Sequence, residues 1–108
     1  MAIFQKTFTG DFDALVEKIE RIVMNGSISA SLEESADYRT PNGARCSIRV
    51  FERYSYAGGN RVSMSVTVFQ ADSDIEVCAI TSGGSSALFF KWNTWGEESF
   101  LETLEDEL

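Results

Sequence analysis

The sequence predicts an α+β fold, a two-layer sandwich in which an antiparallel meander sheet of five or six strands carries two helices on one face. Three observations support this prediction. Residues 62–68 alternate between apolar and polar side chains, as half-buried antiparallel strands do. Residues 12–23 carry apolar side chains at steps of three and four, and residues 94–108 repeat that helical spacing. At 108 residues the whole chain, 1–108, has the length of one domain.

The chain opens with a short strand over residues 3–8, whose place in the sheet the sequence leaves open. Asp11 then has the character of a helix N-cap, because its carboxylate can accept hydrogen bonds from the amides of a first turn. Asn25-Gly26 predicts the end of that helix. The predicted buried stripe of the helix consists of Phe12, Leu15, Val16, Ile19, Ile22 and Val23.

A second strand is expected over residues 27–39, where most even-numbered positions are apolar and the odd-numbered ones are polar. Glu34 interrupts this alternation, which indicates a break near Glu33-Glu34. A turn at residues 40–43, ending in Asn-Gly, leads into a long hairpin.

The register of the hairpin, residues 44–70, decides which of its side chains are buried. We expect the even-numbered residues of both strands to share the core face, with Tyr56 opposite Val62, Tyr54 opposite Met64 and Glu52 opposite Val66. The opposite parity, which a two-residue Gly-Gly loop would impose, would place Arg49 and Arg53 in the core. Burying an unpaired guanidinium costs more free energy than a preferred turn can contribute.

The remaining chain supplies two further strands and the last helix. Residues 75–80 are apolar on both faces, which favours a central or well-covered strand, and residues 87–92 are expected to form another. Thr94 and Glu97 have the spacing of a capping box at the start of the last helix. The predicted order is β-α-β-β-β-β-β-α, which shares its sequence of elements with the helix-grip layout of small ligand-binding proteins.

Composition and charge exclude several classes of function. The chain contains no histidine, so a Ser-His or Cys-His catalytic pair is impossible, and Cys46 and Cys78 have no spacing typical of a metal site. No cofactor is expected. The net charge of −8, without a basic helix, argues against a nucleic-acid partner. No apolar run approaches a membrane span and no leader pattern follows Met1, so a cytoplasmic protein is expected.

Glu52 is the first candidate site residue, because the expected register places its carboxylate on the apolar face. It would then act as a polar anchor in a ligand pocket between sheet and helices, with Tyr38, Tyr54 and Tyr56 supplying hydroxyls. The alternative is a bulge near Phe51 that turns Glu52 outward to an arginine and Phe51 inward. An enzyme would need Glu52 or Glu34 as its acid or base, and no sequence feature demands that.

The second candidate surface is a row of arginines on the hairpin. Arg45, Arg49 and Arg53 point the same way, and the expected register places them outward together with Phe51 and Phe69. They would form an anion-binding or acidic-partner surface, or a dimer interface. The alternative is a solvated face with cross-strand pairs to Glu33, Asp37 or Glu76.

Several short stretches of the chain resemble a known family. These are Phe51-Glu52-Arg53-Tyr54, Gly83-Gly84-Ser85, Phe90-Lys91 and the run from Asn93 to Glu97. Together they are similar to a family of small bacterial proteins of about this length that is catalogued only as a domain of unknown function. The resemblance implies a bacterial single-domain protein and transfers no catalytic or binding residue.

The sequence therefore predicts a small non-enzymatic interaction module that self-associates as a homodimer through the outer sheet face. The alternative is a small-molecule binder with a pocket around Glu52 and the tyrosines.

Overall fold

The computed structural model describes residues 1–54, 60–83 and 90–108, with the backbone alone at residues 90–95. Within these residues, five strands and two helices follow one another along the chain. Their bounds are β1 (Ala2–Phe8), α1 (Phe12–Asn25), β2 (Ser31–Arg39), β3 (Arg45–Tyr54), β4 (Arg61–Gln70), β5 (Ile75–Gly83) and α2 (Phe90–Glu105).

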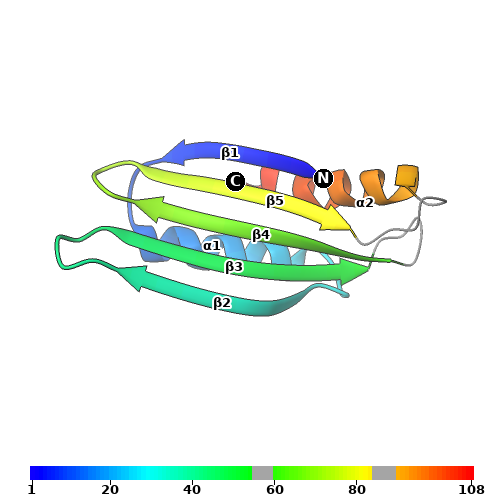
Figure 1. Ribbon diagram of the computed structural model, residues 1–108, viewed down its shortest axis with the longest axis horizontal. Coiled ribbons are helices and arrows are strands. Elements are labelled where there is room, and N and C mark those ends of the chain that lie inside the picture. Colours follow the sequence, from blue (N-terminus) through cyan, green and yellow to red (C-terminus); the bar gives the residue numbers. More distant parts are fainter. Residues whose placement is uncertain (55–59, 84–89) are drawn as a thin grey trace.

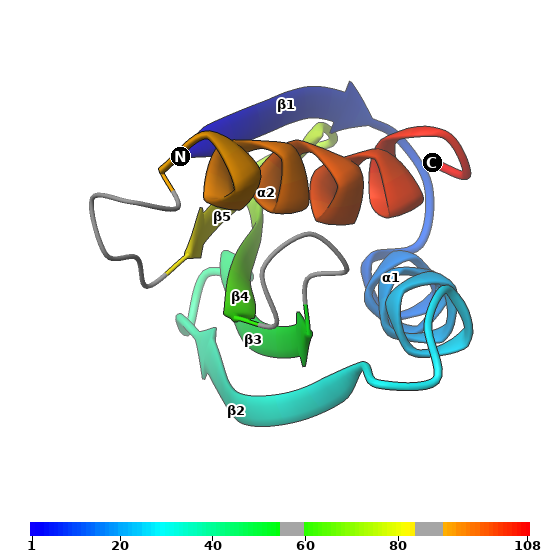
Figure 2. The same ribbon diagram turned by 90° about the vertical axis from the view of Figure 1, so that its right-hand side faces the viewer.

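The five described strands form one antiparallel sheet in the order β1-β5-β4-β3-β2. The four strands from β2 to β5 are a meander, and β1 lies at the far edge beside β5 (Figure 1). Figure 2, which looks at the molecule from one end, shows α1 and α2 on the same side of the sheet. The α+β fold predicted from the sequence is therefore confirmed.

Helix α1 follows the predicted pattern closely. Asp11 is the N-cap, and its side chain accepts a hydrogen bond from the Ala14 amide at 3.2 Å. The helix ends at Asn25, and Gly26 caps it. Its buried residues are Phe12, Val16, Ile19 and Val23, all members of the predicted stripe.

Helix α2 begins earlier than its sequence indicates. Residues 90–92, expected to end a strand, belong to its first turn, and residues 84–89 lie outside the described part of the chain. Thr94 is therefore inside the helix, and Glu97 does not complete a capping box. The Glu97 side chain instead reaches β5, where it accepts a hydrogen bond from the Gly83 amide at 2.8 Å, and its carboxylate pairs with the N-terminal amine of Met1. This tertiary contact outweighs the local capping motif.

The register predicted for the hairpin is wrong. Arg53 lies opposite Val62, Phe51 opposite Met64 and Arg49 opposite Val66, so each residue of β3 is shifted by an odd step from the expected pairing. Because side chains alternate across a strand, an odd shift moves the whole of β3 to the other face. The odd-numbered residues of β3 now face the helices. Tyr56, the last residue of the expected pairing, lies outside the described residues.

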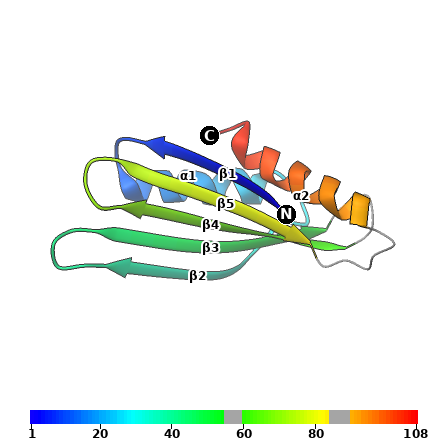
Figure 3. The same cartoon turned by 45° about the horizontal axis from the view of Figure 1, so that its top comes forward.

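The core lies between the sheet and the helices. Phe51 of β3, Met64 of β4 and Ile75 of β5 are fully buried there against Ile19 of α1 and Phe100 of α2. Helix α2 packs on β5, β1 and β4, and its tilt across that half of the sheet is visible in Figure 3. The helix-side face of the sheet is therefore closed over most of its area.

A smaller prediction, the break near Glu33-Glu34, is confirmed. The register of β2 against β3 shifts between Leu32 and Glu34, where the sequence indicated a break. Cys46 and Cys78 are free thiols on β3 and β5, the strands that flank β4. Two strand spacings, about 9 to 10 Å, are too long for a disulfide.

Gly26 allows α1 and α2 to approach each other closely. A Cβ at this position would overlap the Thr103 methyl group of α2 and lie 3.1 Å from the Ile22 carbonyl oxygen. Because the φ of Gly26 is −76°, the backbone itself accepts any residue. The glycine is required by the space between the helices and not by the turn.

We expect Gly26→Ala to lower the free energy of unfolding by about 1–3 kcal/mol, the usual cost of overpacking. Adding Thr103→Ser removes the methyl group that the new Cβ meets and keeps the hydroxyl, so the double variant should recover most of the loss. Urea denaturation of the two single variants and the double variant measures the coupling. Strictly additive effects would show that the two residues are not in contact.

Candidate interaction surface

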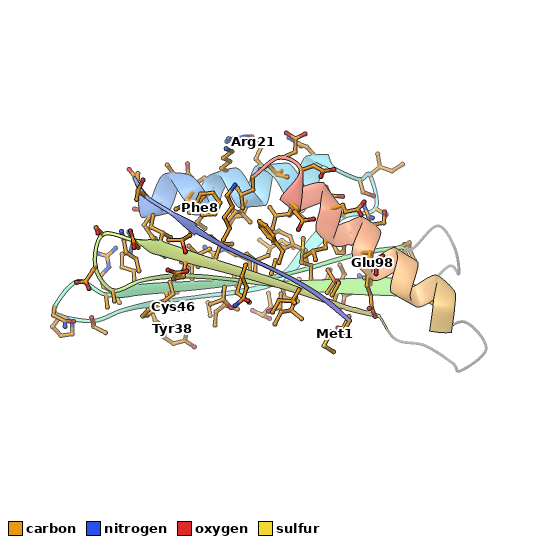
Figure 4. The ribbon with its side chains drawn as sticks, turned by 90° about the horizontal axis from the view of Figure 1, so that it is seen from above. Met1, Phe8, Arg21, Tyr38, Cys46 and Glu98 are labelled. Carbon is orange, nitrogen blue, oxygen red and sulfur yellow. The ribbon has the colours of Figure 1, made fainter. Side chains whose placement is uncertain are left out.

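The sheet face away from the helices, here called the open face, carries side chains from all five described strands. In Figure 4 the side chains of Tyr38 and Cys46 point away from the helices, whereas Phe8 lies on the helix side. The strand pairings place on the open face Ile3, Gln5, Thr7, Glu34, Ala36, Tyr38, Cys46, Ile48, Val50, Glu52, Tyr54, Arg61, Ser63, Ser65, Thr67, Phe69, Glu76, Cys78, Ile80 and Ser82.

The middle of the open face is largely apolar. Val50, Ser65, Ile80 and Ile3 form one row across β3, β4, β5 and β1, and Glu34 of β2 lies beside Val50 at the end of this row. Ile3 and Ile80 are exposed, and Val50 is partly exposed. Apart from Glu34 at the β2 edge, the charged residues of the open face lie towards its two ends. The surface is therefore an uncharged, largely apolar centre between charged ends.

Strand β3 explains why the open face is apolar. Its odd-numbered side chains, which face the helices, are Arg45, Ser47, Arg49, Phe51 and Arg53. Its even-numbered side chains, which face away, include Cys46, Ile48 and Val50. The strand thus presents its more polar side to the helices and its more apolar side to solvent.

Each arginine of the row is held by a helix of the same chain. The guanidinium of Arg45 donates to Asp13 of α1 at 2.6 Å and lies 4.4 Å from the centre of the Phe12 ring. The hydrogen bond lowers the pKa of Asp13 below its usual value and raises the pKa of Arg45.

Arg49 joins α1 to the sheet edge. Its Nε donates to Glu20 at 2.6 Å, and its Nη1 lies 3.1 Å from a carboxylate oxygen of Asp37 on β2. Burial opposes the charge of Arg49, but the two carboxylates outweigh it and the pKa of Arg49 is raised. Hydrogen bonds from Ser47 and Arg49 lower the pKa of Asp37. The predicted cross-strand pair with Asp37 is present, although on the helix side.

Arg53 is buried beneath α2, with 6 % of its surface exposed. Its guanidinium lies 4.6 Å from the centre of the Phe100 ring and donates to Ser99 at 3.0 Å and to Thr103 at 3.4 Å. The expectation that Arg45, Arg49 and Arg53 form an outward anion-binding surface is therefore wrong. They bind groups of their own chain because α1 and α2 supply carboxylates and hydroxyls above β3.

The two phenylalanines predicted to share the outer face are separated by the observed register. Phe51 faces the helices and is fully buried, whereas Phe69 lies on the open face. Of these two residues, only Phe69 therefore remains a candidate for an interface on the open face. Phe51 turns inward, as the alternative interpretation of Glu52 predicts. The cause is the register of the whole strand and not a local bulge.

Glu52 lies on the open face, so it does not anchor a pocket between the sheet and the helices. Its carboxylate accepts a hydrogen bond from Ser63 at 3.2 Å and pairs with Arg61 at 2.7 Å. Arg61 also lies 3.5 Å from Glu33. The alternative interpretation, an outward Glu52 that meets an arginine, is the one that the structure supports.

The tyrosines do not gather around Glu52 as a pocket. Tyr38 and Tyr54 are both exposed on the open face but lie at its opposite ends. Tyr38 of β2 is beside Cys46 at the start of β3, whereas Tyr54 is the last residue of β3. Tyr56 lies outside the described residues. Tyr54 lies near Glu52 along β3, and the guanidinium of Arg61 is 5.7 Å from its ring centre.

Hollows on the described part of the molecule lie away from Glu52. A groove of about 450 Å³ runs along the contact between the C-terminal ends of α1 and α2, and Arg21, Asn25, Thr103 and Glu107 are among its lining residues. A smaller hollow of about 60 Å³ lies at one end of the open face, lined by Tyr38, Cys46 and Phe69 among others. Neither hollow includes Glu52.

Sequence comparison connects this structure with other proteins. Residues 1–108 match a family of unknown function, DUF6054. The chain belongs to the DUF6054 family. The resemblance expected from the short stretches of sequence is thus confirmed, and the match covers the whole chain. No curated protein matches this DUF6054 sequence.

The residues that make the open face apolar were not singled out from the sequence. The sequence pattern predicts a core-facing position for Ile48 and Val50 and a covered strand for Ile80. For Ile80 a signal is visible in the sequence, because β5 is apolar on both sides and so needs cover on both faces. Within the described residues, neither helix is long and apolar enough to cross a membrane, and no group of three or more Cys, Asp or Glu residues is arranged to hold a metal ion.

Proposed function

We propose that this protein is a non-enzymatic interaction module that forms a homodimer through its open face. The observation that carries the proposal is the reversed polarity of β3. In a sheet covered on one side only, strands place their apolar side chains towards the cover and their polar ones towards water. Strand β3 does the opposite at Arg45, Arg49 and Arg53, and leaves Ile48 and Val50 on the uncovered side.

The size of the open face matches what a stable dimer needs. Five strands spaced about 4.8 Å apart and strand lengths of about nine residues give a face of roughly 24 by 30 Å, or about 700 Å². Standard interfaces bury about 800 Å² on each partner. The face has enough area for a specific contact if most of it is covered.

The chemistry of the face favours a second copy of the chain as the partner. Val50, Ser65, Ile80 and Ile3 carry no charge, and the only charged residue of their row is Glu34 at its β2 end, so a partner must also be uncharged and largely apolar opposite these four residues. A second open face has these properties. Contact between the same patch on both copies gives a closed dimer and leaves neither sheet face exposed to further association.

Light scattering or sedimentation tests this proposal. The native chain should have the mass of a dimer at tens of micromolar, and Ile80→Glu should shift it to a monomer while the circular dichroism spectrum stays folded. Met24→Glu is the matched control, because Met24 is an exposed apolar residue of α1 outside the open face. A native chain that stays monomeric, or an Ile80→Glu variant that remains dimeric, would exclude the proposed interface.

A second candidate function is small-molecule binding, and the groove between the ends of α1 and α2 is the observation that favours it. Its volume of about 450 Å³ lies within the range of ligand pockets. A compound that raises the melting temperature of the protein through this groove should lose its effect in Asn25→Trp and keep it in Met24→Trp, because Asn25 lines the groove.

The expected cytoplasmic location and bacterial origin remain predictions.

A further inference from the structure

We propose that the two copies place their open faces together with opposite ends in register, so that Tyr54 of one copy enters the hollow beside Cys46 of the other. This inference rests on the proposed homodimer and specifies its geometry. It follows from the distribution of shape and charge along β3 and β4.

The strand pairings divide the open face into rows that run across the sheet. One end row contains Tyr38, Cys46, Phe69 and Glu76, which are neighbours on β2, β3, β4 and β5. The other end row contains Tyr54 and Arg61, which are neighbours on β3 and β4. Val50 lies midway along β3 between Cys46 and Tyr54. A two-fold axis across the Val50 row therefore exchanges the two ends.

The two ends differ in shape. The end that contains Cys46 has the hollow of about 60 Å³, with the rings of Tyr38 and Phe69 among its walls. The end that contains Tyr54 has an exposed aromatic side chain on the same strand, with 55 % of its surface accessible. Exchange of the ends brings one copy's Tyr54 over the other copy's Cys46. Aromatic side chains contribute strongly when they fill such a hollow.

The two ends also differ in charge. Arg61, which pairs with Glu52 of its own chain, is half-exposed at one end, and Glu76 is exposed at the other, next to Phe69. With opposite ends together, Arg61 of one copy lies over Phe69 of its partner and within reach of Glu76. With like ends together and the axis along β4, Arg61 would instead lie over the Arg61 of the other copy. Like charges across an interface cost affinity. The proposed arrangement places Glu34 opposite the Glu34 of the other copy, but this pair lies at the exposed β2 edge, where solvent screens it, whereas Arg61 belongs to the middle strand.

Cysteine cross-linking separates these two arrangements, because Cys46 is a native reporter at one end. In a Cys78→Ser background, Tyr54→Cys places a thiol where the proposed arrangement puts it against the other copy's Cys46. Glu76→Cys places a thiol at the position that the like-ended arrangement would bring against the other copy's Cys46. Neither pair can join within one chain: Cys46 and position 54 are about 26 Å apart along β3, and Cys46 and position 76 lie two strands apart.

After mild copper–phenanthroline oxidation at ten or more micromolar protein, we expect more than half of the Tyr54→Cys chains to run as a disulfide-linked dimer on non-reducing gels. The Glu76→Cys chain and the Cys78→Ser parent should remain largely uncross-linked. Cross-linking of Glu76→Cys in preference, or of neither variant, would overturn the opposite-ended geometry.

Because Tyr54→Cys also removes the inserted ring, a charge exchange provides an independent measurement. Arg61→Glu and Glu76→Arg should each weaken dimerisation at least tenfold, and the double variant should recover most of this loss. Additive losses would overturn the geometry. Failure of the homodimer itself has a different signature, because the native chain would then be monomeric by light scattering before any substitution.

Discussion

Phe51→Ala is expected to lower the free energy of unfolding by about 3–5 kcal/mol, whereas Phe69→Ala should lower it by less than about 1 kcal/mol in the monomer. Phe51 has 0 % of its surface exposed and packs in the core between the sheet and the helices, so its truncation leaves a cavity. Phe69 is 44 % exposed on the open face, where water can follow the truncation.

The two phenylalanines form a matched pair because they lie on neighbouring strands and differ mainly in the face that they occupy. Urea denaturation at submicromolar concentration, where a dimer of moderate affinity dissociates, compares the variants as monomers. Equal losses would mean that both side chains lie on the same face, which would contradict the observed pairing of β3 with β4. At higher concentration, Phe69→Ala should also weaken self-association.

Arg49→Glu is expected to destabilise the fold by about 1–3 kcal/mol at pH 7, because it removes the guanidinium that two partly exposed carboxylates face and puts a like charge in its place. Arg49 has 12 % of its side chain exposed and lies between Glu20 of α1 and Asp37 of β2. The variant would bring three carboxylates together. This substitution is therefore a test of the fold and not of the dimer interface.

The pH dependence of stability should reverse its sign in this variant. In the native chain, folding lowers the pKa of Asp37. The ionised Asp37 side chain therefore stabilises the fold at any pH above the pKa that it has in the unfolded chain, and this stabilisation is lost as the pH falls through its lower pKa in the folded chain. In Arg49→Glu, protonation relieves the repulsion among the carboxylates, so stability should rise as the pH falls from 7 towards 4.

Thermal unfolding of both proteins across this pH range measures the two slopes. Arg49→Met is the control, because it keeps most of the aliphatic stem without adding a negative charge, and it should lose less stability than Arg49→Glu. A slope in Arg49→Glu like that of the native chain would show that Glu20 and Asp37 do not surround this position.

The elements of the fold were predictable where a local signal defines them. The Asp11 cap, the apolar stripe of α1 and the break near Glu34 all depend on residues close together in the chain, and all three are confirmed. The start of α2 was not predictable in this way, because Glu97 serves β5 and the N-terminus in place of a local capping box.

The candidate site was predictable only in part. The sequence indicated that the outer face of the hairpin matters, but it assigned the arginines and Phe51 to that face. The residues that occupy it include Ile48, Val50 and Ile80, whose apolar character in the sequence predicts a buried position.

The sequence by itself determined that β3 and β4 pair and that each alternates between two kinds of side chain. It did not determine which side of β3 faces the helices, because either side of this strand can be buried. Only the tertiary structure decided this. The arginines of β3 donate hydrogen bonds to side chains that lie far away in the chain, namely Asp13 and Glu20 of α1 and Ser99 and Thr103 of α2. A guanidinium supplied with these partners can be buried, and the apolar side of β3 is left on the open face.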